Sequence, residues 1–165
     1  MDIRHATGDD RPAIRAVHEA AFGRSLEADI AEALRETGDE RISLVACDAG
    51  AIVGHVVLSA GRLGDAPVLC LGPIGVLPDR QRDGVGAALM RAVIAEAAGS
   101  DAGLVVLVGH PSYYPRFGFE RAGPLGLQSK WDLDEPWMAL RLPHYDPALR
   151  GLVQFPPGVR MSRAG

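Results

Sequence analysis

A short glycine-containing segment, Gln-Arg-Asp-Gly-Val-Gly at residues 81–86, has the composition of a phosphate-binding loop. It follows an apolar run that ends near residue 77 and precedes a segment of helical periodicity that starts near Val85. Glycines at 84 and 86 let the backbone turn tightly, so that successive N–H groups can approach an anion. The helix that follows directs the positive end of its dipole to the same point. This order predicts a phosphorylated ligand at the N-terminus of that helix.

The elements that must position this loop can be expected from hydrophobic periodicity and from turn residues. A hairpin turn at 48–50 makes the strands before and after it antiparallel, and a looser turn follows at 61–65. The helical connection makes the strands at 68–76 and 104–108 parallel, so the sheet is mixed. Pro73 lacks an N–H and should lie at a bulge or an edge. Strands are expected at 3–6, 42–47, 51–59, 68–76, 104–108 and 137–142, and helices from the capping residues at 7–10 to Phe22, from Ser25 to residue 38, from Val85 to Gly99, and briefly at 111–117.

Composition favours one compact domain spanning residues 1–165. The 165 residues are 47% hydrophobic and 23% charged, which is enough to bury a core. The formal net charge of -4 argues against a nucleic-acid binder. Cys47 and Cys70 lie in apolar runs without a CxxC partner, so no metal site is expected. Two such cysteines indicate a reducing, cytoplasmic location. No apolar run is long enough to cross a membrane, and the last 20 or so residues, rich in proline, are expected to be irregular.

Two motifs in the right order resemble those of the GNAT acetyltransferase family. The strand at 69–76 with the Gln-x-x-Gly-x-Gly loop at 81–86 is similar to the acetyl-CoA-binding motif of these enzymes, and 109–119 is similar to their second motif as it occurs in the bacterial YhbS-like subgroup. The resemblance implies an α/β fold, more strictly α+β, in which a mostly antiparallel sheet contains one splayed parallel pair flanked by helices. It also implies acetyl-CoA as cosubstrate, without a metal.

The resemblance further assigns cofactor contacts. Main-chain amides of the loop would hold the pyrophosphate, and the pantetheine arm would lie along the preceding strand like an extra strand. The cofactor residues implied are Ile74, Gly75, Val76, Gln81, Arg82, Asp83, Gly84, Val85, Gly86 and Tyr114. Arg80 and Arg82 could reach phosphates, although arginines beside a loop more often lie on a solvated surface.

Acetyl transfer needs a base for the attacking group and an acid for the departing thiolate. Tyr114 matches the family tyrosine and is the expected acid, with Tyr113 as the alternative if the register slips. The base is less clear, because residues 70–76 lack the carboxylate that many relatives carry there. Glu27 is the candidate, with a water relay, His55 and His110 as alternatives; Glu27 could equally complement a helix dipole.

Two further groups have open interpretations. Trp131 and Trp137, with the acids at 132, 134 and 135, could line a cleft for a cationic substrate, but are expected rather to close the core and to keep a loop hydrated. Cys70 is expected to be a protonated, inert thiol, which disfavours an acetyl-enzyme.

These patterns predict an N-acetyltransferase that transfers acetyl from acetyl-CoA to a primary amine, on a small molecule or a protein, by direct attack in a ternary complex. The main alternative is a CoA-binding regulatory module without strong catalysis. A nucleotide binder is disfavoured because the glycine loop lies in mid-chain, after a hairpin. No nucleic-acid or membrane partner is expected, and the apolar segment at 152–159 could take part in a homodimer.

Overall fold

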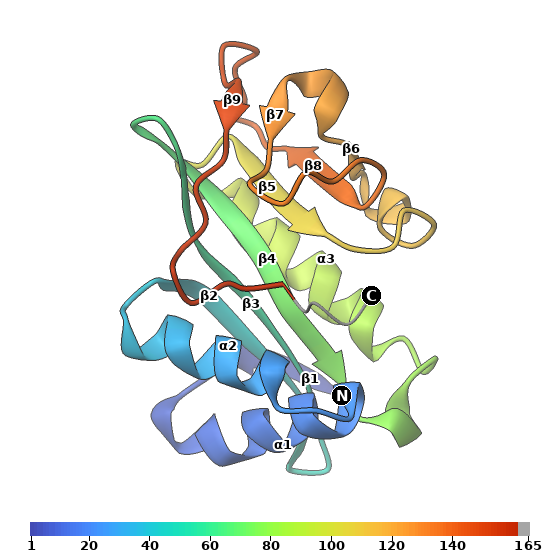
Figure 1. Ribbon diagram of the computed structural model, residues 1–165. Coiled ribbons are helices and arrows are strands. Elements are labelled where there is room, and N and C mark those ends of the chain that lie inside the picture. Colours follow the sequence, from blue (N-terminus) through green and yellow to red (C-terminus); the bar gives the residue numbers. More distant parts are fainter. Residues whose placement is uncertain (162–165) are drawn as a thin grey trace.

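The computed structural model describes residues 1–161, whose strands and helices build a mixed sheet with helices on both faces (Figure 1). Within this part of the chain the sheet has seven strands in the order β1-β2-β3-β4-β5-β8-β6, and β7 pairs with β9 in a small second sheet. The strands are β1 (Asp2–His5), β2 (Glu40–Asp48), β3 (Ala51–Leu63), β4 (Ala66–Val76), β5 (Leu104–Val108), β6 (Glu120–Arg121), β7 (Leu127–Gln128), β8 (Trp137–Arg141) and β9 (Gly151–Leu152). The helices are α1 (Arg11–Phe22), α2 (Leu26–Glu36) and α3 (Val85–Ala98).

The helices cover the two faces of the sheet unequally. Helices α1 and α2 pack together on one face, and α3 lies against the other (Figure 1). The larger apolar core is between α3 and the sheet, where Leu89, Met90 and Val93 are fully buried. A second core surrounds Trp137 at the far end of the sheet. The expected mixed sheet is confirmed: β2, β3 and β4 are antiparallel neighbours, whereas β4 and β5 are parallel.

Strand β4 bulges at Gly72-Pro73, as the missing N–H of the proline predicts. Val56 pairs with Ile74 and Leu58 with Leu71, so two residues of β4 face one of β3. Gly72 has φ +134°, a conformation that favours glycine, and the bond to Pro73 is cis. Beyond the bulge the side chains of Ile74 and Val76 still face the α3 core, while Gly75 faces α1.

Several expected boundaries are wrong. Pairing between β3 and β4 continues to Leu63 and Ala66, so a tight turn replaces the looser one expected at 61–65. The expected helix at 111–117 is a turn followed by a short 3₁₀ helix, Tyr114–Phe117. The segment after residue 143 is not wholly irregular, because β9 pairs with β7 and Gln154 exchanges backbone hydrogen bonds with Arg62.

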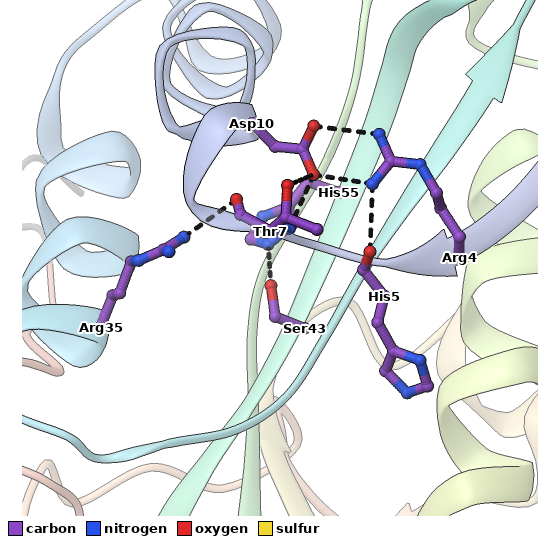
Figure 2. Close-up of polar contacts among 7 residues, drawn as sticks. All are labelled: Arg4, His5, Thr7, Asp10, Arg35, Ser43 and His55. Atoms are coloured by element: carbon purple, nitrogen blue, oxygen red, sulfur yellow. Dashed lines mark hydrogen bonds and ion pairs between the residues drawn. The ribbon is translucent and has the colours of Figure 1, made fainter.

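A polar cluster fixes the start of α1 to the sheet (Figure 2). The buried Asp10 carboxylate accepts hydrogen bonds from the Arg4 guanidinium, at 2.7 and 3.0 Å, and from the backbone N–H of Thr7, at 2.7 Å. The Arg4 bond lowers the pKa of Asp10 far below its ordinary value, with the Thr7 bond adding to the effect. Behind this cluster His55 bonds to Ser43, both from the sheet. The start of α1 is therefore fixed to β1, and the helix covers β3 and β4.

Candidate active site

The glycine loop connects the end of β4 to α3 as predicted. Gly84 is the N-cap of α3 with φ +83°, a left-handed conformation suited to glycine, and among the described side chains none caps the helix. The N–H groups of the first turn are therefore open to an anion. Gln81 braces the loop, since its side-chain N–H donates to the Val76 carbonyl at 3.0 Å.

A groove of about 590 Å³, the loop groove, runs from this loop along the end of β4. Most of the residues predicted to contact a cofactor line it: Ile74, Gly75, Val76, Gln81, Arg82, Gly84 and Gly86. Val85 instead lies in the core, and the exposed Asp83 carboxylate is 3.6 Å from the Arg80 guanidinium. Arg80 is further held by Asp48 at 2.8 Å. Of the two candidate arginines, the structure thus brings Arg82 to the groove.

Arg116 also lines the loop groove, and sequence reasoning missed it. Its guanidinium lies 4.6 Å from the centre of the Tyr113 ring, and its Nε donates to the Tyr113 carbonyl at 2.9 Å. The groove thereby has a second cation facing the glycine loop, which suits a phosphate ligand. A cation two positions after Tyr114 in the second motif was the available signal, but only the tertiary fold shows that it shares a groove with the loop.

A second cavity opens where the parallel strands separate. Within the described chain, β4 and β5 pair at Leu69–Val105 and Cys70–Val106 and then diverge. A cavity of about 340 Å³, the splay cavity, lies between them and is bordered by residues 70–74 of β4 and by residues 107–110 at and after the end of β5. Phe22 and Ile74 line both the splay cavity and the loop groove. A linear ligand could therefore extend from the glycine loop past Ile74 into the splay cavity.

The two adjacent tyrosines point into different spaces. Tyr114 lines the splay cavity and Tyr113 the loop groove, where its hydroxyl lies near Gly86. The Tyr114 ring packs on Gly109 and meets Phe119 edge to face, with 6.0 Å between centroids. Burial, with a smaller effect of Tyr113, raises the pKa of Tyr114 to about 12. The Tyr114 phenol is therefore protonated at neutral pH and able to donate.

Glu27, in the first turn of α2, reaches the same cavity. Its side chain is 12% exposed and lines the splay cavity. The Arg24 guanidinium donates to its two oxygens at 3.0 and 2.6 Å. Ser25 occupies the N-cap position of α2 but makes no capping bond with its side chain. Glu27 is the first acid of the helix and lies close to the positive end of its dipole. Both interpretations of Glu27, base and dipole partner, fit this position.

The two candidate histidines are in different environments. His110 is exposed and borders the splay cavity. His55 is buried away from it, with its Nε2 2.8 Å from Ser43 Oγ and its Nδ1 2.8 Å from Nε2 of His18. His18 was not singled out from sequence; it is fully buried, packs over Gly75, and its Nδ1 has no hydrogen-bond partner among the described residues. The His18–His55 pair thus supports β4 from below the groove.

Of the remaining candidate residues, Cys70 and Trp131 line the splay cavity, whereas Trp137 lies in the core. Cys70 lines the splay cavity, and burial raises the pKa of its thiol to about 12. Trp137 is buried, and its indole N–H donates to the Leu127 carbonyl at 3.0 Å, as expected for a core residue. Trp131 borders the splay cavity, whereas the acids at 132, 134 and 135 are absent from the described lining.

Two other kinds of site find no support in the described chain. Among residues 1–161, no three His, Cys, Asp or Glu side chains are grouped as metal ligands would be. Over the same residues, no helix combines the length and the apolar character that a membrane span requires.

The fold and the two joined cavities define an acyltransferase class in which a glycine loop and a splayed parallel pair share one site. The family model for the acetyltransferase (GNAT) domain matches residues 2–122. The chain belongs to the GNAT acetyltransferase family, and it is an acyltransferase.

Three relatives show how far the similarity extends. The uncharacterized N-acetyltransferase YjhQ of Escherichia coli is 34% identical, over 93% of this chain and 94% of its own length. The crystal structure of the E. coli GNAT family N-acetyltransferase YhbS in complex with CoA is 28% identical, with a TM-score of 0.89 over 95% of this chain and 90% of the other. A Brucella melitensis GNAT family acetyltransferase in complex with acetyl-CoA is 32% identical, with a TM-score of 0.80 over 95% and 96%. The similarity therefore covers both cavities.

Proposed function

We propose that this protein transfers an acetyl group from acetyl-CoA to a primary amine by direct attack in a ternary complex. The observation that carries the proposal is that two neighbouring cavities share Phe22 and Ile74, with the glycine loop lining one and Tyr114 lining the other. Two homologues of known structure, YhbS and the Brucella melitensis acetyltransferase, contain CoA and acetyl-CoA respectively, which supports the loop groove as the cofactor site.

The residues of the loop groove fit this cosubstrate. The open N–H groups at the start of α3 would hold the pyrophosphate, with Arg82 and Arg116 as counter-charges. The pantetheine arm would bond to the edge of β4 at residues 74–76, which has no strand on its β5 side within the described chain. Gly75 contributes no side chain to this surface, and its Cα is already covered by His18. The thioester would then enter the splay cavity.

The chemistry divides between two side chains of that cavity. The amine gives up a proton to Glu27, directly or through water, and its lone pair attacks the thioester carbonyl carbon. A C–N bond forms, the C–S bond breaks, and the electron pair goes to sulfur, which takes the proton of the Tyr114 phenol. Tyr114 is suited to this role because it is neutral and half-buried.

A covalent acetyl-enzyme is disfavoured by the state of the nearest thiol. Cys70 is 2% exposed, and its raised pKa keeps it protonated at neutral pH. Since the thiolate is the nucleophilic form, Cys70 is a poor attacking group. A single direct displacement needs no such intermediate.

A second candidate function is a CoA-binding regulatory module with weak catalysis. The specific observation in its favour is that residues 70–76 carry no carboxylate, while Glu27 is engaged by Arg24. The cytoplasmic location and the homodimer expected from the sequence remain predictions beside either function.

Isothermal calorimetry with acetyl-CoA, followed by a thiol-release assay with a panel of primary amines, separates these functions. We expect acetyl-CoA to bind and free thiol to appear only when amine is present. Binding without amine-dependent release would favour the regulatory module. Absence of binding would contradict both.

A further inference from the structure

The C-terminal segment forms one wall of the splay cavity. It leaves β9 and passes over the face of the sheet that carries α2 (Figure 1). Phe155 of this segment packs against Trp131, with 4.7 Å between ring centroids, and both rings line the cavity. Further along, Val159 lines the cavity and packs against the apolar cluster of Ile30. An aromatic pair and an aliphatic side chain thus close the space opposite the splayed strands.

The rest of the cavity surface is also largely apolar. Phe22 and Ile30 contribute from the helices, and Leu71, Pro73 and Leu107 from the strands. A ligand lying here would exchange water for hydrocarbon and aromatic contacts over most of its surface.

Charge in and around the cavity has a defined distribution. Among the described residues that line it, Glu27 is the only acid. A neighbouring depression of about 650 Å³ shares Trp131, Val159, Arg160 and Met161 with the cavity and is bordered by Lys130 as well. Arg160 is 57% exposed and lies 4.0 Å from Asp29, so its charge is only loosely compensated. Because Glu27 already pairs with Arg24, the cavity can hold at most one further positive group beside it, and Arg160 and Lys130 repel a second one.

We propose that the acceptor is a primary amine carried on an aromatic or branched apolar body without a second positive charge. This inference rests on the proposed acetyl transfer and names the substrate class of the same site. The amino group lies at Glu27, facing the thioester, and the apolar body lies against the wall that the Trp131–Phe155 pair forms. These two side chains determine specificity by contact with the acceptor and do not take part in the chemical step.

A comparison of acceptors tests the substrate class. With acetyl-CoA saturating, 2-phenylethylamine should be acetylated with a kcat/KM about tenfold or more above that of ethanolamine, because it fills the apolar space. Spermidine should be poorer than 2-phenylethylamine. A higher kcat/KM for spermidine or ethanolamine would overturn the substrate class and leave the acetyltransferase proposal intact. Failure to bind acetyl-CoA in calorimetry would instead overturn the proposed function.

Variants of the wall test the two side chains. Trp131→Ala and Phe155→Ala should each raise the KM for 2-phenylethylamine about tenfold, with little change in kcat, in the KM for ethanolamine or in acetyl-CoA affinity. Leu152→Ala is the matched control, because Leu152 belongs to the same C-terminal segment and is 49% exposed outside the cavity. Trp131 lies in a loop at the surface, so its variant keeps the test available if loss of Phe155 unfolds the protein. Equal KM values for wild type and Trp131→Ala would overturn the assignment.

Discussion

Tyr114 has the protonation state that an acid for a departing thiolate requires. Burial raises its pKa to about 12, so removal of the hydroxyl alone tests the role without changing charge. We expect Tyr114→Phe to lower kcat on the order of 100-fold, the usual contribution of a positioned general acid. Acetyl-CoA affinity, measured by calorimetry, should remain close to that of wild type, because the phosphate contacts lie in the loop groove.

Tyr113→Phe provides the comparison for this prediction. Tyr113 lines the loop groove, so loss of its hydroxyl is expected to affect acetyl-CoA affinity more than kcat. A larger fall in kcat for Tyr113→Phe than for Tyr114→Phe would reverse the assignment of the two tyrosines.

Glu27 is the other residue whose role can be tested by a nearly isosteric change. If it accepts the amine proton, Glu27→Gln lowers kcat/KM on the order of 100-fold in the thiol-release assay. Glu36→Gln is the matched control, since Glu36 is an exposed acid on the same helix and pairs with Arg11. An unchanged kcat/KM in Glu27→Gln, with lower stability alone, would show that the carboxylate only supports the start of α2.

At the scale of elements, the glycine loop and the bulge of β4 could be predicted because their causes are local. Gly84 is needed for its left-handed backbone, and Pro73 cannot donate to β3; both facts can be inferred from neighbouring residues. The walls of the splay cavity depend on long-range contacts instead. Trp131 and Phe155 are 24 positions apart and meet only through the fold of the C-terminal segment. The sequence therefore predicted the backbone of the glycine loop and left the walls of the splay cavity open.

The difference between local and long-range causes also explains which structural features were not predicted from the sequence. Strands β6, β7 and β9 have two residues each, too short for any periodicity to appear. The pairing of His18 with His55 joins α1 to β3, and the separate positions of the two histidines gave no sign of it. In the expected helix at 111–117, prolines at 111 and 115 restrict the backbone and leave a turn and a 3₁₀ helix.

The N-terminus of α3 gives a prediction at this scale. Gly84→Val places a β-branched residue at φ +83°, which costs roughly 1–2 kcal/mol in the left-handed region and displaces the first-turn N–H groups from the anion position. We expect acetyl-CoA affinity to fall at least about tenfold in calorimetry.

Gly38→Val separates backbone strain from loss of the binding site. Gly38 has φ +77°, close to the φ of Gly84, and at either position a Cβ would meet no described atom within 4 Å. Gly38 follows α2 and does not line the loop groove. Both variants should lose similar thermal stability, but Gly38→Val should keep wild-type affinity for acetyl-CoA. Equal affinities in the two variants would contradict the role of the loop.

At the scale of the whole molecule, a buried polar path links the helical layer to the sheet under the loop groove. Ser43, His55 and His18 connect β2, β3 and α1 by contacts of 2.8 Å, and His18 ends against Gly75 of β4. Both cavities lie on β4, so the same path that positions α1 also supports the strand that would carry the cofactor arm. Stability of this layer and geometry of the site are therefore coupled through neutral histidines.

This coupling predicts a steep loss of stability in mild acid. Burial lowers the pKa of His18 from 6.5 to about 4, despite an opposing effect of Glu27. Burial, and to a lesser extent His18, lowers the pKa of His55 from 6.5 to about 3, despite an opposing effect of Asp10. Below about pH 6.5 the unfolded chain binds protons at both histidines while the folded chain does not, so acid favours unfolding. Each histidine adds a slope of up to about 1.4 kcal/mol per pH unit to the free energy of unfolding until its folded-state pKa is reached.

Urea unfolding across this range should show a shallower slope of the free energy of unfolding against pH in the double variant His18→Gln, His55→Gln than in wild type. His144→Gln, which changes an exposed histidine, should keep the wild-type slope. Parallel slopes in all three proteins would mean that the buried pair is already protonated in the folded state.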